Sequence, residues 1–184
     1  MVLFINACVR RESRTKRLAE HLLSEAGKPY REVRVHEIDF PVTDEDYLSL
    51  RDRLIAEQDF GNPLFELARD FSNAEEIVIA APLWDLSFPA ALKQYFEQIN
   101  VAGVTFRYTP EGEIEGLCRA EKLTYVTTAG GDSFPEEYGF GYVKALAETF
   151  YGISDVRLIK AAGLDIYGAD TEEILRSAFD RCKN

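Results

Sequence analysis

The chain has 184 residues, a formal net charge of −11, 46% hydrophobic and 29% charged residues, which is typical of a globular protein rather than a disordered one. This length predicts one domain, residues 1–184, that can bury a core of its own. The acidic balance argues against nucleic acid as a partner, and the longest apolar runs are too short to span a membrane.

The first element is a short buried strand followed by a cationic turn and a helix. Val2–Ala7 reads as a parallel strand, and Ser13 is placed to cap a helix that runs to Ala26. A helix start offers free N–H groups, and guanidinium groups add charge, so this turn predicts a phosphate site. The alternative is a solvated basic face. Five of the 21 cationic residues lie here: Arg10, Arg11, Arg14, Lys16 and Arg17.

The rest of the chain alternates between strands and helices. We expect strands at 32–38, 76–81, 123–128 and 156–161, and helices at 44–59, 63–71, 87–99, 138–150 and 171–181. Pro110 and Gly112 indicate a small β-hairpin inserted near 104–117. The alternation predicts an α/β three-layer sandwich with a five-stranded parallel sheet of order 2-1-3-4-5. Ligands of such a sheet bind at the carboxyl ends of strands one and three.

The loop after the third strand contains the only tryptophan of the chain between two prolines. Proline stiffens a loop, and a rigid aromatic and aliphatic ledge suits a flat conjugated ring. The alternative is that Trp84 fills the core or a subunit contact. The residues expected to line the ring are Pro82, Leu83, Trp84, Asp85 and Leu86.

The loop after the fourth strand, Thr128-Ala129-Gly130-Gly131, ends in paired glycines. Such glycines allow a ligand to approach the backbone closely, although an ordinary tight turn is the alternative. Three unusual loops at one sheet edge together favour a ligand with a phosphate tail and a planar polar ring, which is the shape of FMN. Phe106, Phe134 and Tyr138 are candidates for an aromatic wall facing the substrate, or else core or dimer contacts.

The cysteines and histidines favour neither a metal site nor a disulfide framework. Cys8, Cys118 and Cys182 form no CxxC pair, and we expect each to be a small buried apolar side chain. Only Cys8, beside a helix start and arginines, could have a lowered pKa. The two histidines lack ligand spacing, so no metal is expected. Without a signal-peptide pattern, the expected location is cytoplasmic.

Three segments together resemble the FMN-dependent NAD(P)H:quinone reductase and azoreductase family, which has a flavodoxin-like fold. They are 81–93 (Ala-Pro-Leu-Trp-Asp-Leu-Ser-Phe-Pro-Ala-Ala-Leu-Lys), 103–108 (Gly-Val-Thr-Phe-Arg-Tyr) and 127–131 (Thr-Thr-Ala-Gly-Gly). The resemblance implies that Ser13, Arg14 and Thr15, with Arg10 nearby, hold the phosphate. It also implies that 82–86 line the flavin ring, that 128–131 meet its pyrimidine edge, and that the protein is a homodimer.

The chain departs from the family pattern at two places near the ring. Asp85 stands where the family often has Asn, and Thr128-Ala129 where it has a serine-arginine pair. A carboxylate beside the flavin would disfavour its anionic reduced form, and the arginine that could balance that charge is missing.

We therefore expect a flavoenzyme that passes hydride or electrons from NADH or NADPH to quinone-like, azo or nitroaromatic acceptors by a ping-pong mechanism. The flavin carries the chemistry, so no catalytic side chain is predicted. The alternatives are a flavodoxin-type electron carrier without its own NAD(P)H oxidation and a flavin-free regulatory or binding module.

Overall fold

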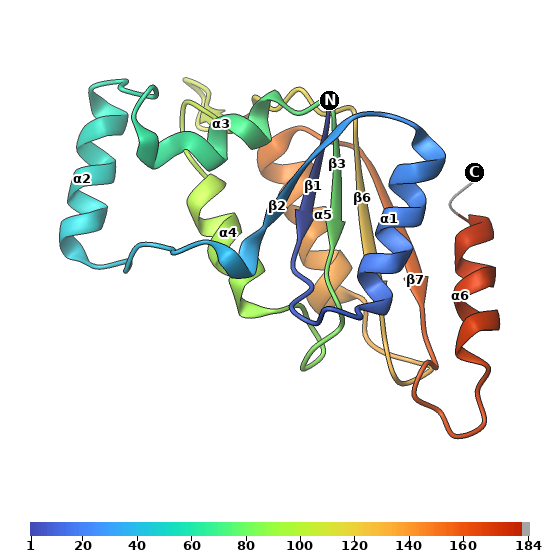
Figure 1. The fold of residues 1–184 in the computed structure, drawn as a ribbon. Coiled ribbons are helices and arrows are strands. Elements are labelled where there is room, and N and C mark those ends of the chain that lie inside the picture. The colour runs from blue at the N-terminus through green and yellow to red at the C-terminus, as the bar shows by residue number, and fades with distance from the viewer. Residues whose placement is uncertain (182–184) are drawn as a thin grey trace.

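The computed structural model describes residues 1–181 and is built around a parallel sheet of five strands (Figure 1). The strand order is β2-β1-β3-β6-β7. Once the two hairpin strands are set aside, this is the predicted order 2-1-3-4-5, which is thereby confirmed. The strands are β1 Val2–Asn6, β2 Tyr30–Arg34, β3 Glu76–Ala80, β6 Lys122–Thr128 and β7 Asp155–Ala161.

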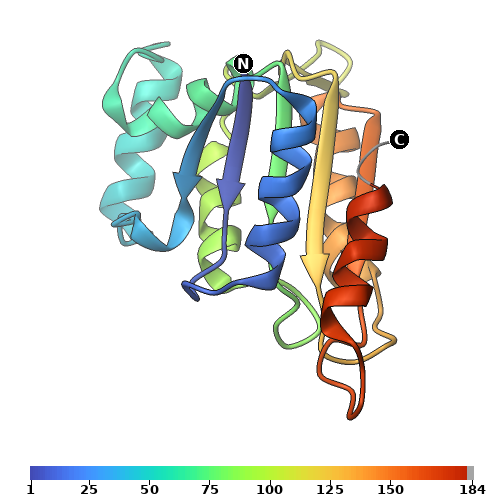
Figure 2. The ribbon, with the colours of Figure 1, turned by 45° about the vertical axis from the view of Figure 1, so that its right-hand side comes forward.

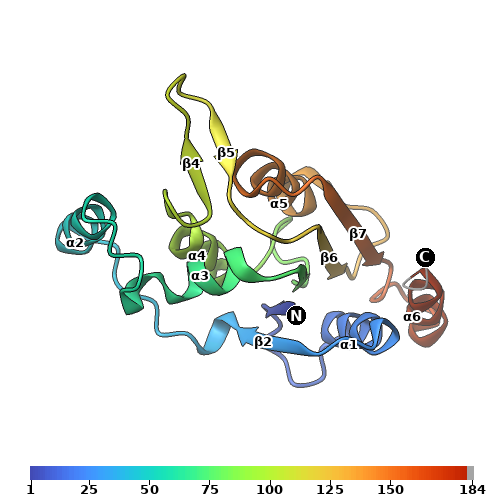
Figure 3. The same cartoon turned by 90° about the horizontal axis from the view of Figure 1, so that it is seen from above.

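Helices cover both faces of the sheet, as the alternation of elements predicts. In Figure 3, α1 and α6 lie on one face, α3, α4 and α5 lie on the other, and α2 stands apart beyond the β2 edge. The helices are α1 Arg14–Ala26, α2 Glu45–Ala56, α3 Glu66–Asn73, α4 Ala90–Ile99, α5 Tyr142–Leu146 and α6 Thr171–Asp180. None of the helices within residues 1–181 combines the length and apolar character that crossing a bilayer requires.

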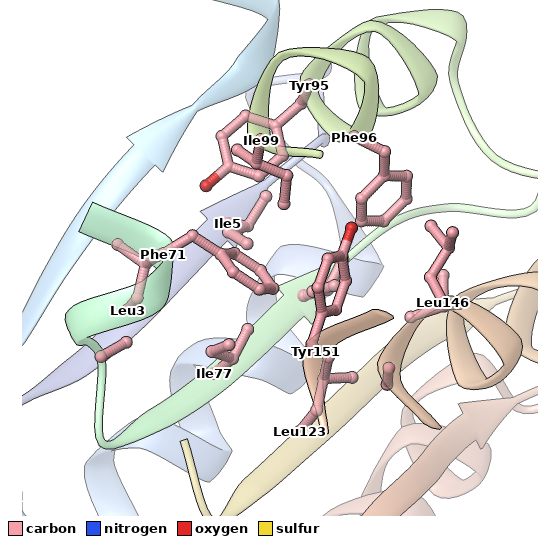
Figure 4. Close-up of a cluster of buried hydrophobic side chains, with 14 of the residues drawn as sticks. Leu3, Ile5, Phe71, Ile77, Tyr95, Phe96, Ile99, Leu123, Leu146 and Tyr151 are labelled. Atoms are coloured by element: carbon pink, nitrogen blue, oxygen red, sulfur yellow. The ribbon is translucent and has the colours of Figure 1, made fainter. Parts of the chain in front are cut away.

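The two faces of the sheet bury separate apolar clusters because successive strand residues point in opposite directions. In β1, Leu3 and Ile5 belong to the larger cluster, whereas Val2 and Phe4 pack on the α1 and α6 side. Figure 4 shows the larger cluster, in which the rings of Phe71 and Tyr151 lie 4.7 Å apart, centroid to centroid. This packing places the strand ends, and hence the loops that follow them.

Several predicted elements differ from the observed ones. The helix expected at 87–99 begins only at Ala90, the one expected at 44–59 ends at Ala56, and the one expected at 63–71 is a 3₁₀ turn, Pro63–Phe65, followed by α3. The second strand was expected at 32–38 but spans Tyr30–Arg34, because Val35–Glu37 turns out of the sheet as a 3₁₀ turn that buries Val35. The helix expected at 138–150 is α5 flanked on each side by a wider, π-helical turn, at Glu137–Gly141 and Ala147–Tyr151.

The predicted hairpin is confirmed: β4 Phe106–Tyr108 pairs antiparallel with β5 Ile114–Gly116. It projects beyond the α4 and α5 layer (Figure 3). Gly116 touches the end of the α5 segment so closely that a Cβ atom there would lie 2.2 Å from the backbone nitrogen of Gly152.

We expect Gly116→Ala to lower the free energy of unfolding by about 1–3 kcal/mol, because the added methyl would meet backbone that cannot move away cheaply. Gly61→Ala is the matched control: its Cβ would have nothing nearer than Asp59 Oδ1 at 3.8 Å, so a change within about 0.5 kcal/mol is expected. Urea denaturation of both variants checks this, and equal stabilities would contradict the close approach at Gly116.

Candidate functional site

A cavity of about 230 Å³ lies where β1, β3 and β6 end, at the sheet edge that the strand order predicts for a ligand. The loops that form it leave the lower ends of these strands in Figure 2. Its lining residues are Cys8, Val9, Arg10, Glu12, Ser13, Arg14, Thr15, Pro82, Leu83, Trp84, Thr128, Ala129, Gly130 and Asp165. The structure therefore brings the three predicted loops together.

The start of α1 forms one end of the cavity. Ser13 caps the helix as predicted, its Oγ accepting a hydrogen bond from the Lys16 N–H at 3.2 Å. Within residues 1–181, the N–H groups of Arg14 and Thr15 have no acceptor. The Thr15 side chain turns inward, and its Oγ1 lies 2.6 Å from Thr128 Oγ1. The first turn of α1 thus offers free donors and is tied to the end of β6.

Arg14 lines the cavity but already has protein partners. Its Nη1 donates to the carbonyl oxygen of Leu164 at 3.0 Å, and its Nη2 lies 2.9 Å from Asp165 Oδ1. Asp165 reaches this place because Gly130 has no side chain: a Cβ there would lie 2.4 Å from Asp165 Oδ2. The sequence interpretation missed Asp165, although the loop after the fifth predicted strand must end at the same sheet edge.

The five cations near the start of α1 do not form one cluster. Only Arg10 and Arg14 line the cavity. Arg17 points away and is paired through both terminal nitrogens with Glu172, each bond 2.9 Å long. Arg11 and Lys16 line a neighbouring hollow. The five cations therefore do not surround one site, and Arg14, Lys16 and Arg17 diverge because successive residues of a helix point in different directions.

The tryptophan loop forms a second wall. Leu83 N–H donates to Thr128 O at 3.1 Å, so the loop is fixed to β6. Trp84 and Ser87 exchange two backbone hydrogen bonds, of 3.0 and 2.8 Å, and so close a tight turn. The two residues between them, Asp85 and Leu86, have positive φ angles of 49° and 68°. Pro82, Leu83 and Trp84 line the cavity. Trp84 is 40% exposed, which excludes the alternative that it fills the core of this chain.

Asp85 and Leu86 form the exposed tip of this turn and do not line the cavity. The left-handed backbone at Asp85 is one that Asp and Asn tolerate better than most residues, because their short side chains can hydrogen-bond locally.

The glycine loop completes the cavity on the β6 side. Thr128, Ala129 and Gly130 line it, whereas Gly131 does not. The carbonyl groups of 129–131 accept hydrogen bonds from 163–165, but the N–H groups of Gly130 and Gly131 have no acceptor within residues 1–181. Gly130 is needed here for the approach of the Asp165 side chain, while a Cβ at Gly131 would make only an ordinary van der Waals contact, 3.8 Å from Ser133 O.

The three aromatic residues expected to face a substrate are not gathered in one wall. Phe106 is 7% exposed, and its ring packs on those of Phe150 and Tyr108, with centroids 4.9 and 5.6 Å apart. Phe106 is therefore a core residue of the hairpin and does not face a substrate. Phe134 lies under Lys160 Nζ, 5.6 Å from the ring centroid. Tyr138 is 54% exposed, and its carbonyl oxygen accepts the Ser87 hydroxyl at 2.6 Å, so its backbone adjoins the tryptophan turn.

Neither Cys8, at the cavity, nor Cys118, packed on the larger core, is activated. Burial raises the pKa of the Cys8 thiol to about 11, and this outweighs the nearby Ser13 and Lys16, so the expectation of a lowered pKa is wrong. Burial likewise raises the pKa of Cys118 to about 12, and Cys182 lies outside the described residues. Over 1–181, no group of three His, Cys, Asp or Glu side chains is arranged to hold a metal ion.

Comparison with known proteins agrees with this architecture. The family model described as flavodoxin-like fold matches residues 1–184. A curated FMN-dependent NADH:quinone oxidoreductase of Clostridium perfringens is 33% identical over 189 residues, with 98% of this chain and 94% of the relative covered. An FMN-dependent NADH:quinone oxidoreductase of Lachnoclostridium phytofermentans is 37% identical over 181 residues, with 93% of this chain and 90% of the relative covered.

Among solved structures, an FMN-dependent NADH-azoreductase of Bacillus anthracis, in complex with FMN, has a TM-score of 0.82 at 24% identity, with 99% of this chain and 95% of the other covered. This likeness shows the fold. Because the family model spans the chain and curated relatives cover more than nine-tenths of it, the chain belongs to the flavodoxin-like family of FMN-dependent NADH:quinone oxidoreductases.

Proposed function

We propose that this protein is an FMN-dependent oxidoreductase that passes hydride or electrons from NADH or NADPH to quinone-like, azo or nitroaromatic acceptors. The observation that carries the proposal is the single cavity joining the free N–H groups of α1 to the ledge of Trp84 and to the glycine loop. The names of the curated relatives, FMN-dependent NADH:quinone oxidoreductases, support the same activity.

The residues of the cavity fit a group with a phosphate tail and a planar polar ring. The unpaired N–H groups at the start of α1 suit phosphate oxygens, and those of Gly130 and Gly131 suit carbonyl oxygens of a ring. We assign Ser13, Arg14 and Thr15, with Arg10, to the phosphate. We assign the ring to Pro82, Leu83 and Trp84, with Asp85 and Leu86 in the exposed turn that follows them. We assign its pyrimidine edge to Thr128, Ala129 and Gly130, with Gly131 next to them.

The protein's part in the reaction is to bind, orient and shield. When bound, FMN supplies a ring that accepts hydride and donates electrons. The side chains of Leu83 and Trp84 exclude water from one side of the cavity, and the hydrogen bond from Leu83 N–H to Thr128 O keeps the two walls in register. The proposal assigns no side chain as acid, base or nucleophile, since the thiol of Cys8 stays protonated at neutral pH.

We extend the proposal in three ways. Residues 1–184 form a single flavin-binding domain, two copies of it form a homodimer in the cytoplasm, and the two substrates react in turn by a ping-pong mechanism. Trp84, Leu86 and Tyr138 leave 40%, 54% and 54% of their surface exposed, and apolar side chains so exposed favour contact with a second subunit. Cys8 and Cys118 are free thiols, which fits a reducing compartment.

The activity is tested by anaerobic titration of the FMN-loaded protein with NADH and with NADPH. We expect either donor to bleach the flavin absorbance and a quinone to restore it, with parallel lines in double-reciprocal plots if both substrates use one site in turn. Nitroaromatic and azo compounds then define the acceptor range. Negligible reduction by both nicotinamides would contradict an oxidoreductase and favour an electron carrier.

The phosphate assignment is tested by Arg14→Ala. Loss of the guanidinium should weaken FMN binding by roughly tenfold to a hundredfold, because charge-assisted hydrogen bonds are among the stronger ones. Arg17→Ala is the matched control, since Arg17 is paired with Glu172 outside the cavity. Fluorescence titration with FMN and with riboflavin separates the causes: an equal loss of affinity for both would show that Arg14 supports the cavity rather than the phosphate.

The ring assignment is tested through the single tryptophan. We expect FMN to quench the emission of Trp84 strongly, because the indole lines the cavity where the ring is placed. Inorganic phosphate, which has no ring, should leave the emission unchanged, and N-acetyltryptophanamide corrects for light absorbed by FMN. If saturating FMN leaves the corrected emission as it was, the ring does not lie against Trp84.

A further inference from the structure

A second hollow adjoins the candidate site, on the other side of the loop that leads into α1. It has a volume of about 440 Å³ and shares Cys8, Val9 and Arg10 with the first cavity. We call it the basic hollow. Its lining residues are Asn6, Cys8, Val9, Arg10, Arg11, Lys16, Arg34, His36 and Glu37.

The basic hollow concentrates positive charge on a protein whose net charge is −11. Four Lys and Arg side chains, together with His36, line it, against the single carboxylate of Glu37. Within the described chain, Arg10 and Arg11 have no ion-pair partner within 4 Å. These two guanidinium groups are therefore available to an anion.

The remaining cations of the hollow are held in place by carboxylates. Lys16 Nζ lies 3.3 Å from Glu20 Oε1, and Arg34 lies 3.2 Å from Glu32 and 3.3 Å from Glu37. These pairs are part exposed, so solvent weakens them and an anion can share their cations.

The floor of the hollow is built from the ends of β1 and β2. Asn6 is 1% exposed; its Nδ2 donates to Glu32 Oε1 at 2.7 Å, and its Oδ1 accepts the Cys8 N–H at 2.8 Å. Arg34 is the last residue of β2, which pairs with β1 at Asn6. The hollow thus stands on the rigid sheet edge next to the candidate site, and not on a free loop.

We propose that the basic hollow binds the diphosphate of the reduced nicotinamide dinucleotide while its nicotinamide ring enters the adjoining cavity. This inference rests on the proposed function. It also gives a role to Arg11 and Lys16. Of the five cations near the start of α1, Arg10 and Arg14 line the cavity and Arg17 pairs with Glu172, so only these two are otherwise unexplained. A dinucleotide needs such a place, because its diphosphate is anionic and the protein as a whole carries a net charge of −11.

The position of the hollow favours this ligand over an unrelated anion. Another hollow lined by basic residues, among them Lys28 and Lys122, lies at the opposite end of the sheet, where β3 and β6 begin. A ligand whose ring reaches the cavity at the carboxyl ends of the strands would place its charged part beside Arg10, which borders both hollows.

The experiment uses the FMN-loaded protein and the variants Arg11→Ala, Arg34→Ala, their double variant and Arg17→Ala as control. Two donors are compared: NADH, and 1-benzyl-1,4-dihydronicotinamide, which has the reacting ring but no phosphate. We expect KM for NADH to rise roughly three- to fivefold for each hollow arginine removed, as for partly exposed charge pairs. We expect kcat, the rates with the benzyl donor and the affinity for FMN to stay as in the wild type.

Two results would overturn the inference. One is a KM for NADH in the double variant that is no higher than in Arg17→Ala. The other is that the double variant also loses activity with the benzyl donor or affinity for FMN. These arginines would then serve FMN binding and not the diphosphate of the dinucleotide. Far-ultraviolet circular dichroism confirms that each variant is folded.

Calorimetry with ADP, which carries the diphosphate without nicotinamide, keeps this test separate from that of the proposed function. Binding by the wild type that is lost in the double variant supports the basic hollow, and equal binding by both overturns it. If neither donor reduces the wild type, the proposed function fails, while the ADP result still decides whether the hollow binds a diphosphate.

Discussion

The buried 2.6 Å contact between the hydroxyl oxygens of Thr15 and Thr128 joins the first turn of α1 to the last residue of β6. Both side chains are buried, so removing one hydroxyl would leave the other without this hydrogen bond. Thr128 O also accepts the Leu83 N–H. One residue therefore sets the spacing of all three cavity walls, and a planar group can bind between them only because α1, the tryptophan loop and β6 are fixed together here.

The central strands β1, β3 and β6 were predictable because they are apolar and buried on both faces. The edge strands β2 and β7 are partly exposed, and their places followed from the alternation with helices. The side chains that enter the site were only partly predictable. Asp165 was missed because its place depends on a gap left by Gly130, and Phe106 was misplaced because the hairpin packs on the α5 segment rather than near the cavity. The pKa of Cys8 went against expectation because burial outweighs nearby positive charge. Such outcomes depend on packing between segments far apart in the sequence.

The turn after Trp84 is held in a backbone conformation that its residues do not favour. Asp85 tolerates a positive φ, but Leu86, at 68°, lies in a region that is costly for a branched side chain. Two backbone hydrogen bonds between Trp84 and Ser87 and the bond from the Ser87 hydroxyl to Tyr138 O hold it there. The surroundings thus impose the turn, and its effect is to keep the indole at the cavity while Leu86 faces outward. Strain of this kind is common where a fold positions a binding surface.

The two hollows beside the start of α1 differ in how they can attract an anion. The cavity is lined by Arg10 and Arg14 but also by Glu12 and Asp165, so its charged side chains balance. Binding of a phosphate there must depend on directed N–H groups and on the dipole of α1, which act at short range. The basic hollow has an excess of cations and acts at longer range, within the limit set by screening. A tightly held group suits the first arrangement. An anionic substrate that must approach an acidic protein, react and leave suits the second arrangement. The local positive charge of the basic hollow speeds its encounter with the protein, and no single contact has to hold it tightly.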